Sequence, residues 1–311
     1  MRHFLAIVAM AATIAQVNPG AADDLVKMTI GQRGNWDTSI THHGEKAGIF
    51  KKHGLQLEMI YTSGSGETLQ PVIAGGVDLG LAVGAAYAKG APVRIIGAQA
   101  TGAADSWYAK NPSIKTLKDT NGHTIAFSTN GSSTNSVVRA FIDEFKLTAK
   151  PQATGNPSAT LTAVMTDQVD VGWASPPFGL KEMEEDKIHL VARATDATLV
   201  RGQTIRVLVA NADVLAKRKD VIERFMKAYR ESIDYMYSSN PQVITDYAEF
   251  AKVPEPMAKR VRDEFFPMSL VNPDKIHGLD SLIPEAVNLK FIPGPLSKEQ
   301  ITELIQISPR Q

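Results

Sequence analysis

The chain of 311 residues is predicted to fold as an α/β protein with two related lobes. Short β-type runs alternate with helical patterns, which is typical of parallel sheets with right-handed crossovers. The segment 68–82 (TLQPVIAGGVDLGLA) recurs 92 residues later as 160–174 (TLTAVMTDQVDVGWA), with seven of fifteen positions identical. The alternative, chance similarity between two ordinary β-α-β units, leaves the same fold class. At roughly 150 residues per domain, the length also indicates two domains.

The first half of the chain contains the first set of predicted elements. The helix at 41–53 is expected to end at Gly54, which is a favourable residue just beyond a helix. Alternating hydrophobicity predicts the strand at 55–61. The predicted strands are 27–31, 55–61, 79–83 and 93–98, and the predicted helices are 41–53 and 67–74.

The second half repeats this arrangement and adds a helical C-terminal part. The strand at 123–127 leads through the polar turn STNGSSTNS into a helix, as the strand at 27–31 leads into the first helix. A long amphipathic helix is expected to end at Asn240-Pro241. The predicted strands are 123–127, 188–194 and 205–210, a connecting turn covers 114–119, and the predicted helices are 137–145, 220–237, 255–264, 274–289 and 297–305.

Charge and cysteine content exclude several classes of function. The 33 Lys and Arg residues balance 33 Asp and Glu residues, whereas a nucleic-acid-binding protein would be basic. The absence of cysteine excludes disulfide scaffolds, thiolate zinc sites, iron–sulfur clusters and cysteine nucleophiles. We therefore expect neither a nucleic-acid partner nor a metal or other cofactor.

Residues 1–22 have the features of a cleaved secretory signal peptide. Arg2 and His3 form a short basic region, residues 4–17 are apolar, and Ala21 and Ala22 are small residues suited to cleavage. The apolar run is too short to span a bilayer, and the alternative is a short buried helix. Because no cysteine stands at the cleavage site, a lipid anchor is excluded. We expect a free protein in a Gram-negative periplasm.

Ligand contacts are expected beyond the carboxyl ends of the strands, where open parallel sheets bind their ligands. The turns there consist mostly of Gly, Ser, Thr and Asn, and many lead into helix N-termini. Unpaired N–H groups and hydroxyl donors bind anions without a full positive charge. The alternative is that these hydroxyls only cap helices. The candidate contacts in the turns are Asn35, Ser63, Gly64, Gly84, Thr129, Gly131, Ser132, Ser133, Thr134 and Ser175.

All three tryptophans, Trp36, Trp107 and Trp173, fall in these turns or at strand ends and are further candidate contacts. An indole offers a large apolar face and one N–H donor, which suits an organic ligand as well as a protein core. Arg33, Arg139 and Arg206 are candidates for pairing with a ligand carboxylate. The sequence does not indicate which of these arginines faces the ligand.

The enzyme motifs that we compared with the chain are absent. The SGSG turn at 63–66 lacks the third glycine of a dinucleotide-binding loop, because Leu69 occupies that position. The chain has neither a G-x-x-x-x-G-K-[ST] loop nor a G-x-S-x-G elbow, and His42-His43 is not part of an H-E-x-x-H motif. We therefore assign no catalytic residue and expect a protein that is not an enzyme.

Several segments, in order, resemble the substrate-binding proteins of ABC importers of the nitrate/sulfonate/taurine type. This family also includes binders of a thiamine pyrimidine precursor. The resemblance covers nearly the whole chain after residue 22. The segments that carry it are 47–59 (AGIFKKHGLQLEM), the GSGET turn at 64–68, 74–82 (AGGVDLGLA), 113–142, 168–178 (QVDVGWASPPF) and 205–236.

The resemblance implies a two-lobed periplasmic binding protein of type II, in which each lobe is a mixed, mostly parallel sheet flanked by helices. Lobe one would comprise residues 24–108 and 206–311, and lobe two residues 109–205, with the ligand cleft between them. Hinge closure would capture a small organic anion or polar aromatic compound of the sulfonate, taurine, nitrate or carboxylate type. A monomer would deliver this ligand to a membrane permease.

Two alternatives to this function remain from the sequence. An enzyme on the same scaffold is one, because a fold does not determine a function. The pyrimidine-precursor enzymes of the wider group carry a cysteine-rich motif, which this chain lacks. A sensory domain that acts on a signalling partner is the other.

Overall fold

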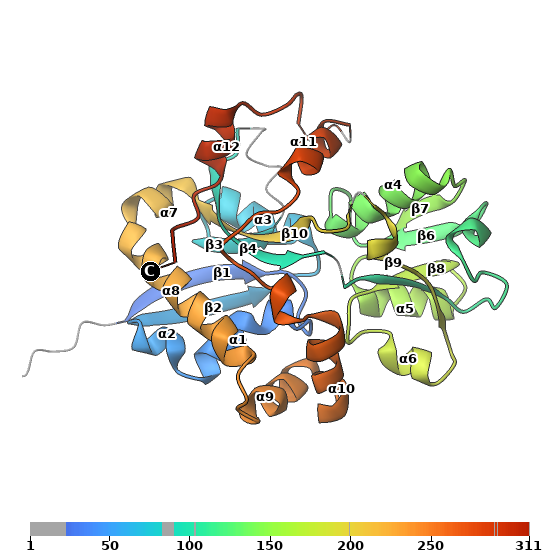
Figure 1. Ribbon diagram of the computed structural model, residues 1–311, viewed down its shortest axis with the longest axis horizontal. Helices are drawn as coiled ribbons and strands as arrows, with labels where there is room; N and C mark the ends of the chain where they lie inside the picture. The colour runs from blue at the N-terminus through green and yellow to red at the C-terminus, as the bar shows by residue number, and fades with distance from the viewer. Residues whose placement is uncertain are drawn as a thin grey trace, which may run out of the picture.

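The computed structural model describes residues 23–310, apart from 83–89, 103, 199, 289 and 291. The predicted signal peptide and the candidate contact Gly84 lie outside the described residues. None of the helices in the described part of the chain combines the length and apolar character that a membrane span needs. Figure 1 shows two α/β lobes side by side, with the N- and C-terminal parts of the chain in the same lobe.

The first lobe is built on a five-stranded sheet in the order β2-β1-β3-β10-β4. β1 pairs in parallel with β2 and β3, whereas β10 runs antiparallel between β3 and β4. The sheet is therefore mixed, and β10, its fourth strand in order, comes from a distant part of the chain. Its strands are β1 (Asp24–Ile30), β2 (Leu55–Tyr61), β3 (Leu79–Ala82), β4 (Val93–Thr101) and β10 (Thr204–Asn211).

The second lobe repeats this topology with a sheet in the order β7-β6-β8-β5-β9. Here β5 is the antiparallel strand, between β8 and β9. Trp107 was expected in a turn or at a strand end as a ligand contact; it instead lies within β5, where it pairs with Trp173. The strands are β5 (Ser106–Ala109), β6 (Thr124–Phe127), β7 (Lys150–Ala153), β8 (Val171–Ala174) and β9 (His189–Arg193).

Helices flank both sheets (Figure 1). The helix predicted at 41–53 is divided into α1 and α2, because Gly48 adopts the left-handed backbone conformation with φ of 71°. The helix predicted from residue 274 begins only at Leu279, and α9 was not predicted. The helices are α1 (Ile40–Lys46), α2 (Ile49–Lys52), α3 (Ser65–Ile73), α4 (Ser133–Phe145), α5 (Pro157–Met165), α6 (Leu180–Glu184), α7 (Ala212–Lys217), α8 (Lys219–Met236), α9 (Gln242–Ala251), α10 (Glu255–Arg260), α11 (Leu279–Asn288) and α12 (Lys298–Leu304).

Short turns of other helix types complete the described elements. The chain has 3₁₀ turns that follow β1, precede β6, follow β9 and lie in the C-terminal region, and a π-helical turn that follows α10. The 3₁₀ turns are Asp37–Ser39, Leu117–Thr120, Ala194–Asp196 and Met268–Leu270, and the π-helical turn is Val261–Phe265.

The internal repeat seen in the sequence is a structural repeat. α3 and α5 are offset by 92 residues, and so are β3 and β8. Thr62 and Thr68 join their hydroxyl groups at 2.6 Å, and their counterparts Thr154 and Thr160 do so at the same distance. Two independent β-α-β units would not be expected to reproduce a side-chain hydrogen bond at the same offset.

A second repeated contact fixes the amino ends of the strands. Asp78, which precedes β3, accepts a hydrogen bond from the backbone N–H of Lys27 in β1. Asp170, 92 residues later and before β8, accepts the equivalent bond from the N–H of Thr124 in β6. Each aspartate thus joins the two central parallel strands of its sheet at the edge opposite their carboxyl ends.

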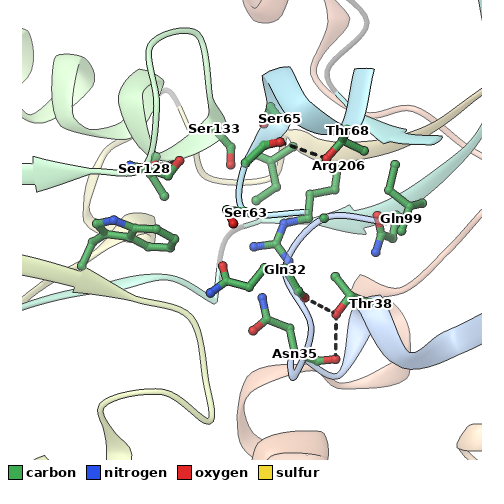
Figure 2. A pocket seen from close by; sticks show the side chains of 16 residues that line it. Gln32, Asn35, Thr38, Ser63, Ser65, Thr68, Gln99, Ser128, Ser133 and Arg206 are labelled. Atoms are coloured by element: carbon green, nitrogen blue, oxygen red, sulfur yellow. Dashed lines mark hydrogen bonds between the residues drawn. The ribbon is translucent and has the colours of Figure 1, made fainter. Parts of the chain in front are cut away.

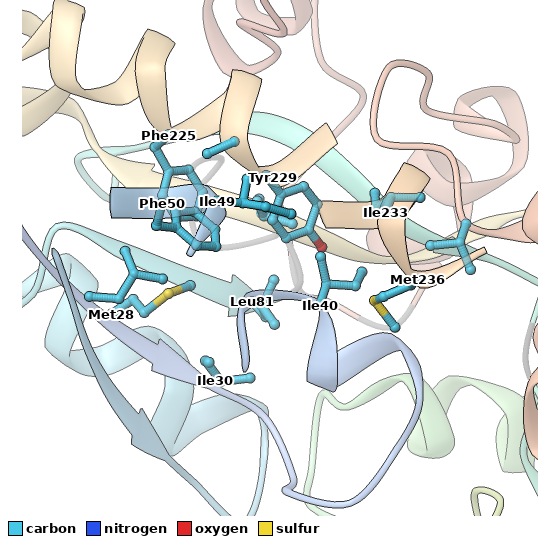
Figure 3. Close-up of a cluster of buried hydrophobic side chains, with 14 of the residues drawn as sticks. Met28, Ile30, Ile40, Ile49, Phe50, Leu81, Phe225, Tyr229, Ile233 and Met236 are labelled. Carbon is cyan, nitrogen blue, oxygen red and sulfur yellow. The ribbon is translucent and has the colours of Figure 1, made fainter. Parts of the chain in front are cut away.

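Each lobe has its own hydrophobic core. In the first lobe, the long helix α8 covers the sheet, and Phe225 and Tyr229 pack against Phe50 and the surrounding aliphatic side chains (Figure 3). In the second lobe, Trp107 packs edge-on against Phe141 of α4 at the centre of a separate core. Each core is formed mainly by one sheet with its own helices, and Leu180 of α6 joins the first core from the second lobe.

The chain passes between the sheets twice, and the two passages lie next to each other. The first joins β4 to β5, and the second joins β9 to β10. Gly102 N–H donates to the carbonyl oxygen of Gln203 at 2.7 Å, and Ala194 N–H donates to that of Asp105 at 2.9 Å. The connection between the lobes is therefore a pair of hydrogen-bonded segments about which the lobes can hinge.

Candidate functional site

A cavity of about 70 Å³ lies between the lobes, beyond the carboxyl ends of β1, β2, β3, β6 and β8 (Figure 2). Both lobes contribute to its wall, which is mostly polar. The residues of lobe one that line it are Gly31, Gln32, Asn35, Thr38, Ser63, Gly64, Ser65, Thr68, Leu81, Gln99, Ile205 and Arg206, and those of lobe two are Ser128, Ser133, Thr134 and Trp173.

The loop after β1 is held in shape by Thr38. Its Oγ1 lies 2.8 Å from the carbonyl oxygen of Gln32 and 3.1 Å from that of Asn35 (Figure 2). Residues 37–39 form a 3₁₀ turn that leads directly into α1, so the loop rests on a packed helix. The turn fixes the backbone at Asn35, whose fully buried side chain lies in the wall of the cavity.

Lobe two contributes the loop that leads from β6 into α4. Ser132 caps this helix, since its Oγ accepts a hydrogen bond from the N–H of Asn135 at 3.1 Å. Thr134 Oγ1 accepts one from the N–H of Ser128 at 2.9 Å and thereby closes the loop. Ser133 faces the cavity (Figure 2). Two roles were considered for this segment. Ser132 caps the helix, and Ser133 lines the cavity, so different residues have the two roles.

The N-terminal ends of α3 and α4 both reach the cavity, one from each lobe. The first amides of a helix have no partner within it, and they carry the positive end of the helix dipole. The lobes also touch here, because a Cβ atom added to Gly64 would lie 3.1 Å from Thr129 Cγ2. The arrangement offers hydrogen-bond donors from both sides to an acceptor group of a ligand.

One fully formed ion pair borders the cavity. Arg206 of β10 places Nη1 at 2.9 Å and 2.7 Å from the two carboxylate oxygens of Asp37. Its Nη2 lies 3.6 Å from Oδ1 of Asp105, which stands in the first passage between the lobes. Although burial lowers the pKa of Arg206, the two carboxylates raise it above its usual value. Arg206 is thus a permanent cation that already has acidic partners.

Several buried polar atoms beside the cavity have no partner in the described protein. They include both amide atoms of Asn35, Oε1 of Gln99 and Nε1 of Trp173. The orientation of Gln99 is fixed, because its Nε2 donates to the carbonyl oxygen of Asp37 at 2.7 Å. Buried polar groups in folded proteins are almost always hydrogen-bonded. A molecule in this cavity would supply the missing partners.

Six of the predicted contacts lie together in the cavity wall, and others do not. Trp36 is buried among Tyr237, Tyr247 and His43, with its Nε1 donating to Tyr237 Oη at 2.9 Å. Trp107 donates to the carbonyl oxygen of Ala126 at 2.8 Å within the second core. The six in the wall are Asn35, Ser63, Gly64, Ser133, Thr134 and Trp173, whereas Trp36, Trp107, Thr129, Gly131, Ser132 and Ser175 are not among the lining residues.

Gln99 and Arg206 are the important lining residues that the strand-end argument missed. β10 runs antiparallel to its neighbours, so its first residues, not its last, lie at the edge that faces the cavity. Of the three arginines considered, Arg206 is the one that reaches the cavity; Arg33 lies over the Tyr61 and Phe250 rings, and Arg139 is exposed. An antiparallel assignment for residues 204–211 would have identified Arg206.

The fold has two α/β lobes with a cavity between them, and comparison with known proteins identifies the family of this chain. The family model described as NMT1/THI5 like matches residues 39–243, so the chain belongs to this family. A binding protein of Brucella abortus (strain 2308) is 23% identical over 224 residues, which cover 70% of this chain and 69% of that protein. It is named only as a binding protein.

Solved structures with the same fold come from periplasmic binding proteins. The alkanesulfonate-binding protein of Xanthomonas axonopodis pv. citri aligns with a TM-score of 0.73 at 14% identity, covering 93% of this chain and 100% of that one. The periplasmic nitrate-binding protein of Synechocystis PCC 6803 gives a TM-score of 0.73 at 11% identity, covering 92% and 87%. The fold predicted from the sequence, a two-lobed periplasmic binding protein with a mixed sheet in each lobe, is therefore confirmed.

Proposed function

We propose that this chain is the solute-binding component of an ABC importer and captures a small organic anion or polar aromatic compound between its lobes. One observation supports this most directly: both lobes line a cavity that contains buried polar atoms without partners. Asn35 and Gln99 belong to lobe one and Trp173 to lobe two. A ligand that bonds to all three would bridge the lobes.

Such a bridge gives the ligand a larger binding free energy for the closed form than for the open form. A ligand shifts a conformational equilibrium only by its difference in affinity for the two states. The paired segments at 102–105 and 194–203 provide the hinge for this motion. No bond of the ligand is made or broken in this function, and we assign no catalytic residue, cofactor or metal.

We place the lobe boundaries within these two passages. The boundary at residue 108 that the sequence resemblance implied would divide β5, which spans Ser106–Ala109 of the second sheet. We further propose export through the signal peptide at residues 1–22, a periplasmic location, and a monomer that docks on a membrane permease. The name of the periplasmic nitrate-binding protein supports the location.

Ligand-dependent stabilisation tests this function. The mature protein would be screened by thermal unfolding against sulfonates, aromatic carboxylates, nitrate and pyrimidines, and native mass spectrometry would identify any compound that co-purifies. A compound at 100 times its Kd stabilises the folded state by about 2.7 kcal/mol, which raises Tm by several degrees. We expect one compound class to produce this shift.

The variant Asn35→Ala tests whether the ligand binds in this cavity. Asn130→Ala is its control, because Asn130 is exposed and outside the cavity wall. We expect the Tm shift to shrink for Asn35→Ala and to persist for Asn130→Ala. A panel that produces no shift with the wild-type protein would contradict the transport function. Chemical conversion of a bound compound would instead favour an enzyme.

A further inference from the structure

The charged side chains at the cavity do not balance. Arg206 contributes one positive charge, and Asp37 and Asp105 contribute two carboxylates whose side chains have no exposed surface. Among the described lining residues Arg206 is the charged one, and the two aspartates contact it from behind the cavity wall. When both aspartates are ionised, this group of three residues has a net charge of −1.

Within this group of three residues, Asp105 carries the negative charge that is not balanced by a positive one. Asp37 receives two hydrogen bonds from Arg206, whereas neither carboxylate oxygen of Asp105 has a hydrogen-bond partner in the described protein. The 3.6 Å from Arg206 Nη2 to Oδ1 is an ion-pair distance, beyond a hydrogen bond. Burial raises the pKa of Asp105, although Arg206 and Ser175 favour its ionised form. The Ser175 hydroxyl favours the ionised form of this buried carboxylate, but no cation in the described protein donates a hydrogen bond to it.

The neighbouring uncharged groups point in the same direction. Oε1 of Gln99 is an acceptor that is buried without a partner in the cavity wall, and the Asn35 amide there leaves both its acceptor Oδ1 and its donor Nδ2 unpaired. With Asp105, this gives a concentration of unused acceptors at the Arg206 side of the cavity. The helix N-termini of α3 and α4 supply donors at the other side (Figure 2).

We propose that the ligand carries a protonated nitrogen, which lies at the Arg206 side of the cavity and offsets the excess negative charge there. This inference rests on the proposed binding function and narrows its ligand class. An acidic group elsewhere in the same molecule is compatible with it, since the helix N-termini can accept that group. A simple monoanion without a cationic nitrogen would leave the negative charge of Asp105 uncompensated.

Matched pairs of compounds that differ only in ammonium against hydroxyl test the proposal. Isothermal titration calorimetry would compare ethanolamine with ethylene glycol, β-alanine with 3-hydroxypropionate, and benzylamine with benzyl alcohol, with nitrate as a simple anion. We expect binding to be at least tenfold tighter for the ammonium member of whichever pair binds. Asp105→Asn should reduce that preference to less than threefold.

Asp170→Asn is the matched control, because Asp170 lies before β8 at the edge of the second sheet away from the cavity. It should keep the ammonium preference, and circular dichroism would verify that both variants are folded. Equal or tighter binding of hydroxyl members or nitrate would overturn the ligand class while leaving the binding function supported. An unchanged preference in folded Asp105→Asn would overturn the role of Asp105. Binding of no compound, including those of the broader panel above, would contradict both proposals.

Discussion

At the scale of single residues, two aspartates illustrate how position determines the energetic effect of the same side chain. Asp105 is fully buried and lacks hydrogen bonds, and burial raises its pKa above the usual value of 3.8. Burial also acts on Asp170, but hydrogen bonds from Thr124 outweigh it and lower the pKa overall. The first aspartate is the one for which we propose a ligand cation as partner, and the second joins two strands.

These opposite shifts predict opposite dependences of stability on pH. A raised pKa in the folded state gives a contribution that is present below the unfolded value and is lost as pH rises. Relative to Asp105→Asn, the wild type should therefore lose unfolding free energy as pH rises above the unfolded value of 3.8. Relative to Asp170→Asn, it should gain unfolding free energy as pH rises from about 3.

Urea unfolding of the wild type and both variants across pH 3–7 measures these differences. Comparison of each variant with the wild type cancels the titration of all other groups, so the slope belongs to the substituted residue. A wild-type stability that rises with pH relative to Asp105→Asn would show that Asp105 is ionised more easily in the folded state.

The tryptophans show what the sequence could not resolve at this scale. Trp36, Trp107 and Trp173 were equivalent candidates, yet only Trp173 lines the cavity. Trp36 lies in the core, where its Nε1 donates a hydrogen bond to Oη of Tyr237, a residue 201 positions later in the chain. Likewise, Arg206 meets Asp37 across 169 positions. Pairing over such separations follows from topology, which a local pattern does not contain.

At the scale of elements, the repeat includes two glycines that sit between a strand and its helix. A Cβ atom on Gly80 of β3 would lie 2.7 Å from Val72 Cγ2 of α3. A Cβ atom on Gly172 of β8 would lie 2.7 Å from Val164 Cγ2 of α5, and equally close to the Tyr108 ring. Both glycines permit close packing of helix on sheet, and the second has an additional neighbour.

We predict that Gly80→Ala and Gly172→Ala each reduce the unfolding free energy by about 1–3 kcal/mol, because the added methyl group overpacks the interface. In a Val72→Ala background, Gly80→Ala should cost less, since Cγ2 is then absent. Val164→Ala should relieve Gly172→Ala much less, because the Tyr108 ring still blocks the methyl group. Chemical denaturation of the two double-mutant cycles measures this difference.

Equal relief in both cycles would contradict the packing described for Tyr108. Gly66→Ala is a suitable reference substitution, since a Cβ atom there meets nothing within 4 Å. It should leave the unfolding free energy almost unchanged or raise it slightly, because alanine favours a helix.

Elements were predicted best where the pattern is local. The strand predicted at 55–61 matches β2, because its alternating side chains reflect one buried face. β5 was missed because its four residues are all buried and give no alternation. β7 was missed because its sequence Lys-Pro-Gln-Ala carries no β-type pattern, and all four residues are exposed at the edge of the sheet.

At the scale of the whole molecule, the two lobes meet at two glycines. Gly64 stands against Thr129 at the cavity, and Gly34 stands against the ring of Phe178, 3.0 Å from a Cβ atom there. The backbone of Gly64 is extended, with φ of −176°, so a side chain at this position meets no conformational strain. A small residue is therefore required at position 64 only because Thr129 of the other lobe lies against it.

We predict that Gly64→Leu holds the lobes apart without unfolding either one. Ligand affinity should fall at least tenfold, and the ligand should no longer reduce the radius of gyration measured by small-angle X-ray scattering. Gly66→Leu, two residues further along the same turn and in open space, should behave as the wild type. Normal closure and affinity in Gly64→Leu would show that the contact with Thr129 is not part of the closed form.

The position of β10 determines the order in which a newly made chain can acquire its structure. β10 is the central partner of β3 and β4, yet the whole second sheet, residues 106–193, is encoded between β4 and β10. As the chain elongates, the inserted lobe has all five of its strands before the first lobe receives its fifth. Pairing across so long a separation is slow, so β3 and β4 wait with open edges until residue 211 has been made. Once residue 211 has been made, a folded second lobe speeds the pairing of β10 with β3 and β4, because it brings the two ends of the insertion side by side.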